Sequence, residues 1–297
     1  MVMMLALAVS PPARGELPAD SVTAPPAEGQ AQGLPDLTLV NFFSEGWTDP
    51  WRREPRYTPD MALLRVLTNH LAKRFRVDYV GTDVANNPKL DATELGNIIM
   101  AYAFNRRLML EATVTYQWNV PPSGVSTNGA AGGLLARFQL VETPTQSYAF
   151  QTKVVAPNKA LGQTQTSIAY SLAGWQDMHA LVPALGRFGL YGSLQYENLV
   201  GPRKASAATN DVSYDISIAE TWTPESTPVF GNFTTFLEAF ATTLLDGSTA
   251  GKTTVSLTPG VRFWFLPSNS LTLGVDVPVS HAPTYHTVFR ATYILNF

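Results

Sequence analysis

Apolar and polar side chains alternate over most of the chain, from about residue 62 to the end. Between Leu108 and Trp118, residues of even number are apolar and those of odd number are mostly polar. Successive side chains of a β-strand point to opposite faces, so each such segment has one apolar and one largely polar face. A helix would need apolar residues at i, i+3, i+4 and i+7, which these windows lack.

Clusters of Gly, Pro, Asn and Asp divide this region into twelve predicted strands. Their expected ranges are 71–81, 95–105, 107–119, 132–142, 146–156, 163–173, 187–198, 210–222, 233–245, 253–265, 270–279 and 286–297. Strands of about ten residues that alternate in this way and are joined by short turns on one side are typical of transmembrane β-barrels.

Periodicity alone fits two all-β architectures, a soluble β-sandwich and a transmembrane barrel. Only 14% of the 297 residues are charged, whereas soluble domains average about 25%. No apolar run reaches the roughly 18 residues of a membrane helix. The alternation continues to the terminal Phe297, and aromatic residues gather near strand ends, as they do at membrane interfaces. We therefore expect a closed, antiparallel, up-and-down transmembrane barrel, with a soluble sandwich as the alternative.

Turn lengths mostly alternate along the predicted strands, as expected when both termini lie on the periplasmic side. The connections 105–106, 143–145 and 267–269 are short, whereas 120–131 and 199–209 are longer and suit extracellular loops. Two connections break the rule, because 174–186 and 223–232 should be periplasmic and are not short. A single helical turn within 176–183 would account for the first.

The residues before the barrel fall into three predicted segments. Residues 1–10 form a short apolar run that fits a truncated secretory signal peptide without its basic region. Residues 11–36 are rich in Pro, Ala and Gly and predict a disordered spacer. Residues 37–61 contain Phe42, Phe43, Trp47 and Trp51. We expect this segment either to dock on the periplasmic side of the barrel or to enter the barrel as a plug. The barrel itself is predicted to span 62–297.

The sequence lacks the residues that several kinds of chemistry require. There is no cysteine, so disulfides and thiolate chemistry are absent. A net charge of −3 argues against nucleic-acid binding. The four histidines lack metal-site spacing, and no nucleotide or hydrolase motif is present. An outer-membrane lipid hydrolase is a remote alternative, because no serine follows a histidine by two residues. We expect no enzyme activity, cofactor or metal.

The stretch 257–297, LTPGVRFWFLPSNSLTLGVDVPVSHAPTYHTVFRATYILNF, resembles the C-terminal hairpins of outer-membrane β-barrels. More narrowly, the chain is similar over 62–297 to the family named for the MetA-pathway of phenol degradation. This resemblance implies a channel or transporter in the bacterial outer membrane, in contact with lipid. It also implies that Tyr293, Leu295 and Phe297 form the signal read by the barrel-assembly machinery.

The side chains opposite the lipid-facing parity are the candidates for lining a lumen. The basic candidates are Arg74, Arg76, Arg137, Lys153, Arg187, Arg262 and Arg290, and the acidic ones are Asp78, Glu111, Glu197, Asp215, Glu238 and Asp276. These charges nearly balance, which predicts weak ion selectivity. They form either a network of paired charges or a ladder that orients solutes.

Four aromatic residues also fall on the inward parity, namely Tyr191, Phe236, Phe240 and Trp264. They either fill the interior of a narrow barrel or form an apolar patch that guides a small hydrophobic or aromatic solute. The sequence thus predicts passive passage of small solutes. A closed barrel with a structural or surface-interaction role is the alternative.

Overall fold

The computed structural model describes residues 34–51, 63–84, 92–121, 126–161, 163–185, 188–202, 207–224, 226–266, 268–280 and 285–297. The account below concerns the compact unit Asp36–Phe297. The predicted signal segment 1–10 and nearly all of the predicted spacer 11–36 lie outside the described residues. Among the residues that the structure describes, no helix is long and apolar enough to cross a membrane.

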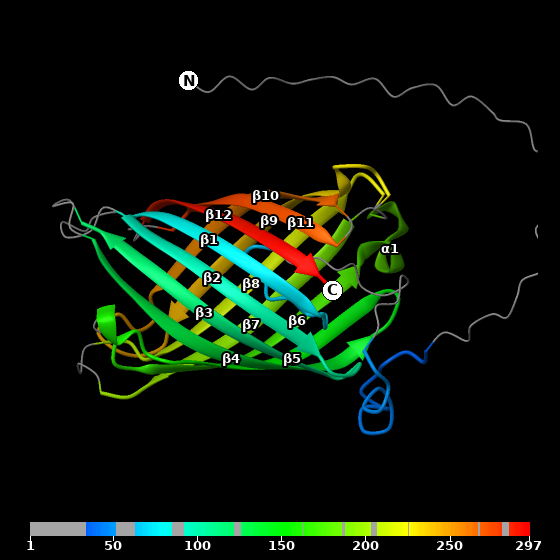
Figure 1. Ribbon diagram of the computed structural model, residues 1–297, viewed down its shortest axis with the longest axis horizontal. Helices are drawn as coiled ribbons and strands as arrows, with labels where there is room; N and C mark the ends of the chain where they lie inside the picture. The colour runs from blue at the N-terminus through cyan, green and yellow to red at the C-terminus, as the bar shows by residue number, and fades with distance from the viewer. Residues whose placement is uncertain are drawn as a thin grey trace, which may run out of the picture. The chain divides into compact units, whose positions relative to one another are not determined.

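Twelve antiparallel strands form one closed barrel (Figure 1). They are β1 Arg74–Val84, β2 Ala92–Ala103, β3 Leu108–Val120, β4 Thr127–Glu142, β5 Gln146–Val155, β6 Thr166–Asp177, β7 Phe188–Val200, β8 Asn210–Thr221, β9 Gly231–Leu244, β10 Thr253–Leu266, β11 Asn269–Pro278 and β12 Tyr285–Asn296. Each strand pairs with its neighbours in sequence, and β1 closes the barrel on β12. The predicted fold class is confirmed, and the alternative of a sandwich is wrong.

The seam between the first and last strands runs almost to the chain terminus. Phe75 lies opposite Leu295, and Tyr79 lies opposite Ala291. Beyond the last strand, the backbone N–H of Phe297 still donates to the carbonyl of Lys73 at 3.0 Å. Closure leaves no unpaired strand edge, which a hydrocarbon environment requires.

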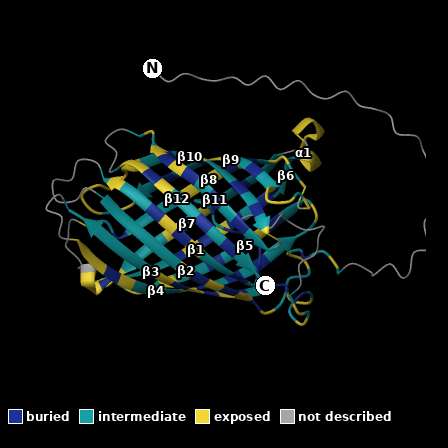
Figure 2. Cartoon of the chain, turned by 45° about the horizontal axis from the view of Figure 1, so that its top comes forward, coloured by how far each residue is buried: buried dark blue, intermediate teal, exposed yellow. Residues whose placement is uncertain are grey.

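Buried and exposed residues alternate along the strands (Figure 2). In β3, Met109, Glu111 and Thr113 are buried, whereas Leu110 is 47% and Val114 is 55% exposed. Large apolar side chains therefore cover the outer face, where a membrane protein contacts lipid. The inner face carries most of the charged residues of the strands.

Four predicted strand starts, at residues 71, 95, 132 and 163, differ from the structure by three residues or more, and the sequence explains two of them. The first strand begins at Arg74 rather than at residue 71, because Leu71 and Ala72 are both buried and break the alternation. The fourth begins at Thr127 rather than at residue 132. The start of this strand, NGAAGG, has only small side chains after Asn128. It therefore shows no alternation of apolar and polar residues from which a strand could be predicted.

The connections differ between the two ends of the barrel. At the end where β1 starts and β12 finishes, Ala103 is followed closely by Leu108, and Glu142 by Gln146. The long β6–β7 connection at this end holds the helix α1, Met178–Leu181, and the 3-10 turn η2, Pro183–Leu185. The carboxylate of Asp177 caps α1 by accepting the N–H of His179 at 2.9 Å. Another 3-10 turn, η1 Lys159–Leu161, lies in the β5–β6 connection at the opposite end.

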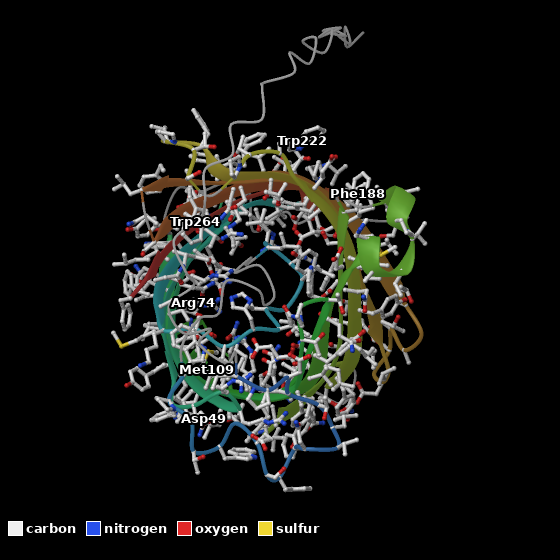
Figure 3. The ribbon with its side chains drawn as sticks, turned by 90° about the vertical axis from the view of Figure 1, so that its right-hand side faces the viewer. Asp49, Arg74, Met109, Phe188, Trp222 and Trp264 are labelled. Atoms are coloured by element: carbon white, nitrogen blue, oxygen red, sulfur yellow. The ribbon has the colours of Figure 1, made fainter. Side chains whose placement is uncertain are left out.

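The stretch Asp36–Trp51, called the rim segment here, lies at the end of the barrel where β1 starts and β12 finishes. Leu37 and Glu142 exchange two backbone hydrogen bonds, of 3.0 and 2.9 Å, and Pro50 forms a bridge with Asn105. Figure 3 looks along the barrel and shows Asp49 beside the wall rather than over the interior.

Candidate functional site: the barrel interior

The structure places the predicted lumen-lining side chains on the inner parity of their strands. Those that are buried are Arg74, Asp78, Glu111, Arg137, Tyr191, Phe236, Glu238, Arg262, Trp264 and Asp276. Those that are half-buried are Arg76, Lys153, Glu197, Asp215, Phe240 and Arg290. Arg187 lies outside the described residues. That these side chains line a solute path stays a prediction.

A stretch of chain that precedes β1 lies inside the barrel, among these side chains (Figure 3). We call Leu63–Lys73 the inner segment. The carboxylate of Glu238 accepts hydrogen bonds from the backbone N–H groups of Arg65 and Val66, both at 3.1 Å. The guanidinium of Arg65 reaches further across and contacts the Asp276 carboxylate at 2.9 Å. These contacts join the start of the inner segment to β9 and β11.

The remainder of the inner segment is held by β4 and β5. Gln151 donates to the carbonyl of Thr68 at 2.8 Å, and Arg137 donates to the carbonyl of His70 at 2.9 Å. The inner segment therefore presents backbone groups to inward polar side chains on both sides of the barrel. Buried backbone polar groups need such partners, which explains why amide and charged side chains occur on the inner face.

The inward aromatic residues pack against the inner segment. Leu63 and Val66 share a buried cluster with Trp175, Tyr191 and Phe236. The guanidinium carbon of Arg65 lies 3.6 Å from the centroid of the Phe240 ring, a cation–π geometry. These two phenylalanine rings are thus covered by the chain itself, as the filling interpretation expects.

Several of the interior charges form ion pairs. Asp276 contacts Arg290 at 2.8 Å in addition to Arg65. Asp78 contacts Arg76 at 2.6 Å. A longer pair joins Arg74 and Glu111 at 3.7 Å. These pairs favour a network of compensated charges over a continuous ladder.

A cavity of about 810 Å³ lies on the inner face at the end opposite the rim segment. We call it the vestibule. It is lined by the last residues of β5 and β7, the first of β6, and their connections. Its polar lining includes Lys153, Gln163, Gln165, Ser167, Gln195 and Glu197. The volume and the polar lining of the vestibule suit a small polar solute.

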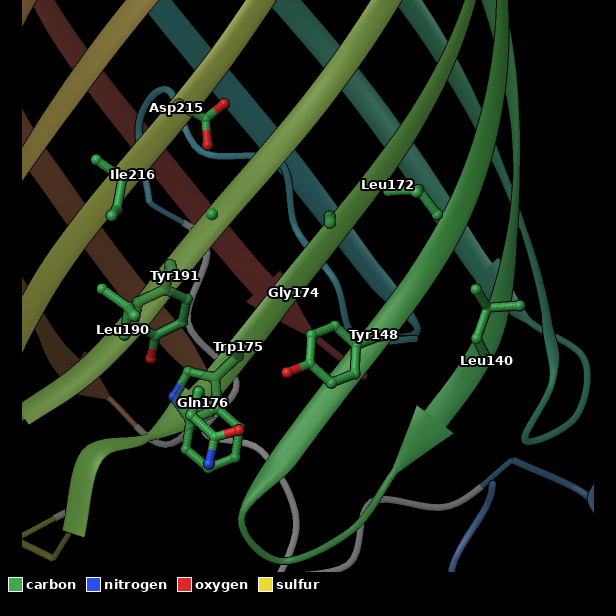
Figure 4. A pocket seen from close by; sticks show the side chains of 12 residues that line it. Leu140, Tyr148, Leu172, Gly174, Trp175, Gln176, Leu190, Tyr191, Asp215 and Ile216 are labelled. Carbon is green, nitrogen blue, oxygen red and sulfur yellow. The ribbon is translucent and has the colours of Figure 1, made fainter. Parts of the chain in front are cut away.

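A second cavity, of about 500 Å³, lies in the barrel wall over β6 and β7 (Figure 4). At its centre Gly174 pairs directly with Gly192, and neither has a side chain. Its walls include the exposed apolar residues Leu172 and Ile216. The Tyr148 ring covers Gly174 so closely that an added Cβ would lie 2.7 Å from the ring. This apolar groove on the outer face fits contact with lipid rather than with a polar solute.

The rim segment is attached by a residue that the sequence analysis did not single out. Arg107, in the β2–β3 turn, is fully buried. Its guanidinium donates to the carbonyls of Gln139 at 2.9 Å, Leu140 at 2.8 Å and Glu45 at 3.0 Å, and to the Asn41 side chain at 2.9 Å. Burial lowers the pKa of Arg107 to about 10, so the side chain remains charged at neutral pH.

The sequence held only a weak signal for these attachments. The pair Arg106–Arg107 stands out because it occupies a very short turn. Gln151 was on the inward parity and would have been found by counting neutral polar residues as well as charged ones. Nothing local to Arg65 indicates that it contacts residues of β9 and β11. No group of three or more potential metal ligands occurs in the part of the chain that the structure describes.

Comparison with known proteins gave matches at the level of structure. No family model and no curated protein matches the sequence. The structure is similar to one described as the COG4313 outer membrane channel from Pseudomonas putida F1, with a TM-score of 0.56 and 13% identity over 81% of this chain and 100% of that one. The chain has the fold of a bacterial outer-membrane channel.

Two porins also align with the chain. The KdgM porin aligns with a TM-score of 0.49 and 9% identity, over 75% of this chain and 99% of that one. The NanC porin aligns with the same score and 7% identity, over 75% of this chain and 98% of that one. At such identities the likeness concerns the fold. The expectation that the chain has no enzyme activity stays a prediction.

Proposed function

We propose that the chain is a channel of the bacterial outer membrane through which small solutes pass without an energy source. The observation that carries this proposal is the contrast between the two faces of the closed barrel. The outer face exposes large apolar side chains, whereas the inner face carries charged and amide groups around a cavity of about 810 Å³. An apolar exterior around a polar interior is the design of a barrel that conducts.

The inner segment sets the width of the proposed path. It occupies the interior between β5 on one side and β9 on the other, as the contacts of Thr68 and Arg65 indicate. Solutes therefore pass beside the inner segment or after its displacement. The pairing of interior charges supports weak selectivity between cations and anions.

The test is the conductance of the purified chain in planar lipid bilayers, compared with that of Arg65→Ala. This variant loses the ion pair with Asp276 and the contact with Phe240. We expect discrete conductance steps from the parent chain and larger steps from the variant. Lys159→Ala, which changes an exposed residue of η1, is the control. Silent bilayers for all three proteins would refute the channel.

A closed barrel with a structural or surface-interaction role is the second candidate. The observation in its favour is the inner segment, whose contacts reach β4, β5, β9 and β11. The same bilayer measurement separates the two, because a closed barrel gives no steps even when Arg65 is replaced.

The solute class that we propose is small and hydrophobic or aromatic, with Phe236 and Phe240 as the guiding surface once the inner segment has moved. We also propose that the chain belongs to the family named for the MetA-pathway of phenol degradation, because its C-terminal stretch resembles that family. Replacement of both phenylalanines by alanine should change the uptake of an aromatic solute more than that of a sugar of similar size. Equal changes for the two solutes would remove this assignment.

We also propose that the last strand carries the signal by which the barrel-assembly machinery recognises the chain. Tyr293 and Leu295 share the outward parity of β12, and the terminal Phe297 is 61% exposed. Deletion of Phe297 should reduce the amount of folded barrel in the outer membrane, measured by heat-dependent mobility on SDS gels. Normal accumulation without Phe297 would exclude this role.

A further inference from the structure

Two opposite charges face the vestibule at one level of the barrel. Lys153 of β5 pairs in register with Ala169 of β6, and Ala169 pairs with Glu197 of β7. The two charged side chains are therefore separated by one strand that carries only a methyl group. Neighbouring strands lie about 4.8 Å apart, so the two Cα atoms are roughly 10 Å apart.

These two charges differ from the paired ones deeper in the interior. Within the described part of the chain, Lys153 has no hydrogen-bond or ion-pair partner, and it makes no ion pair with Glu197. Glu197 instead accepts a hydrogen bond from the Ser167 hydroxyl at 2.6 Å. Asp211 of β8 lies opposite Glu197 in the register, which adds negative charge on that side. The vestibule thus has a positive and a negative side.

The lining between the two charges can bind a polar solute. The side-chain nitrogen of Gln165 is buried and has no hydrogen-bond partner among the described residues, although an amide nitrogen usually donates. Gln195 and Gln165 both line the vestibule, and the small side chain of Ala169 leaves room in front of the wall. A ligand that accepts from an amide and carries both charges would satisfy all of these groups.

We propose that the vestibule binds small zwitterions of the amino-acid type, with the carboxylate toward Lys153 and the ammonium group toward Glu197. The role of this site in transport rests on the proposed channel function. It adds a binding step for doubly charged solutes at the end opposite the rim segment, separate from the proposed passage of hydrophobic or aromatic solutes along Phe236 and Phe240. Charge-assisted hydrogen bonds at both ends orient the solute across the lumen. A solute with only one of the two charges leaves either Lys153 or Glu197 without an oppositely charged partner.

The test compares three probes of equal chain length, which are 4-aminobutyrate, butyrate and butylammonium. Their binding to the full-length chain in a non-ionic detergent is measured by calorimetric or NMR titration. We expect 4-aminobutyrate to bind about tenfold more tightly than either singly charged probe, because one additional charged contact is made. Equal affinities for the three probes would overturn the proposal.

Variants assign the two ends of the probe. Lys153→Met should weaken 4-aminobutyrate binding about tenfold and leave butylammonium unchanged, whereas Glu197→Gln should leave butyrate unchanged. Lys153→Arg retains the charge and should retain the preference. Lys159→Met and Glu94→Gln make the same changes of charge outside the vestibule lining. If Lys153→Met and Glu197→Gln bound 4-aminobutyrate as tightly as the parent chain, the assignment would be contradicted.

The double replacement Lys153→Glu with Glu197→Lys reverses the two sides and should restore the preference for the zwitterion. Heat-dependent mobility on SDS gels verifies that each variant is folded. Because titration needs no flow, the two proposals fail separately. Silent bilayers with a preserved preference would refute only conduction, and conducting barrels without a preference would refute only the vestibule site.

Discussion

Arg107 illustrates how one side chain secures a segment that has little regular structure. The rim segment forms two isolated bridges with the barrel, one with Glu142 of β4 and one with Asn105 in the β2–β3 turn. Its other backbone carbonyls need donors, and the planar guanidinium of Arg107 supplies several in fixed directions. Phe42 also lies 5.0 Å from this guanidinium. Much of the attachment of the rim segment therefore depends on the geometry of one side chain.

Arg107→Ala should release the rim segment while the barrel remains closed. Loss of hydrogen bonds from a buried charged group should lower the free energy of opening by about 2 kcal/mol, equivalent to roughly 30-fold faster cleavage under conditions in which proteolysis follows the open population. Chymotrypsin cleavage at Phe42 and Phe43 is the measurement. Lys252→Ala, an exposed site, is the control, and equal cleavage of the two variants would disprove the role of Arg107.

Asp246, in the β9–β10 connection, provides a pH-dependent contact. Its carboxylate accepts hydrogen bonds from the backbone N–H groups of Thr209 at 2.6 Å and Asn210 at 3.0 Å. These bonds and the Thr209 hydroxyl lower the pKa of Asp246 below its usual value of 3.8. A lowered pKa in the folded state means that the stabilisation is complete above pH of about 4 and is lost as the pH falls further.

Hydrogen exchange of the Thr209 and Asn210 amides tests this contact. After correction for the intrinsic exchange rate, protection should be constant from neutral pH to about pH 5 and should decrease below about pH 4. Asp246→Asn should reduce protection at neutral pH and remove the acid-dependent decrease. Identical profiles for the two proteins would show that the carboxylate does not hold this loop.

Among the strands, β9 and β10 show what alternation predicts and what it leaves open. The alternation predicted that Phe236 points inward, but it did not predict which residue packs against its ring. Phe236 lies opposite Gly260 in the register, and its ring occupies the space where that glycine has no side chain. Alternation assigns a residue to a face of the sheet. It does not encode which residue on the next strand is small enough to accept its ring.

Gly260→Ala should destabilise this pair of strands. A Cβ built at Gly260 would lie 2.2 Å from the Phe236 ring and 2.8 Å from the carbonyl oxygen of Leu273, and such overpacking costs about 1–3 kcal/mol. The temperature at which the barrel loses its folded mobility on SDS gels should fall. Gly132→Ala is the matched control, because a Cβ there meets nothing within 4 Å. Equal temperatures for both variants would contradict this packing.

At the scale of the whole molecule, the sequence predicted the barrel but not its contents. The order, number and parity of the strands were readable because lipid and lumen impose a period of two. The inner segment depends on contacts such as the one between Arg65 and Glu238, which lie 173 residues apart. Backbone groups make many of these contacts, so no side-chain pattern marks them. The stretch 37–61 was predicted to dock on the barrel or to enter it as a plug. Its described part, 37–51, lies at the rim, whereas the inner segment belongs to 63–73.

A covalent link would test whether the inner segment controls passage. The chain lacks cysteine, so a pair introduced as Asn69→Cys with Ser147→Cys has no competing partner. The Asn69 side chain already contacts the carbonyl of Ser147 at 3.1 Å. The oxidised form should conduct less than the reduced form, and each single variant should not respond to reductant. A verified disulfide without any effect on conductance would mean that passage does not require movement of this segment.

The inner segment and the rim segment share one mouth of the barrel. Trp51 packs near Leu71 and Met109, and Arg74 begins β1 at the same end. The end of the rim segment and the end of the inner segment therefore meet at a single opening of the barrel. Withdrawal of the inner segment as far as Leu71 would break contacts made by side chains but no pairing between strands, so the barrel need not unfold to empty itself.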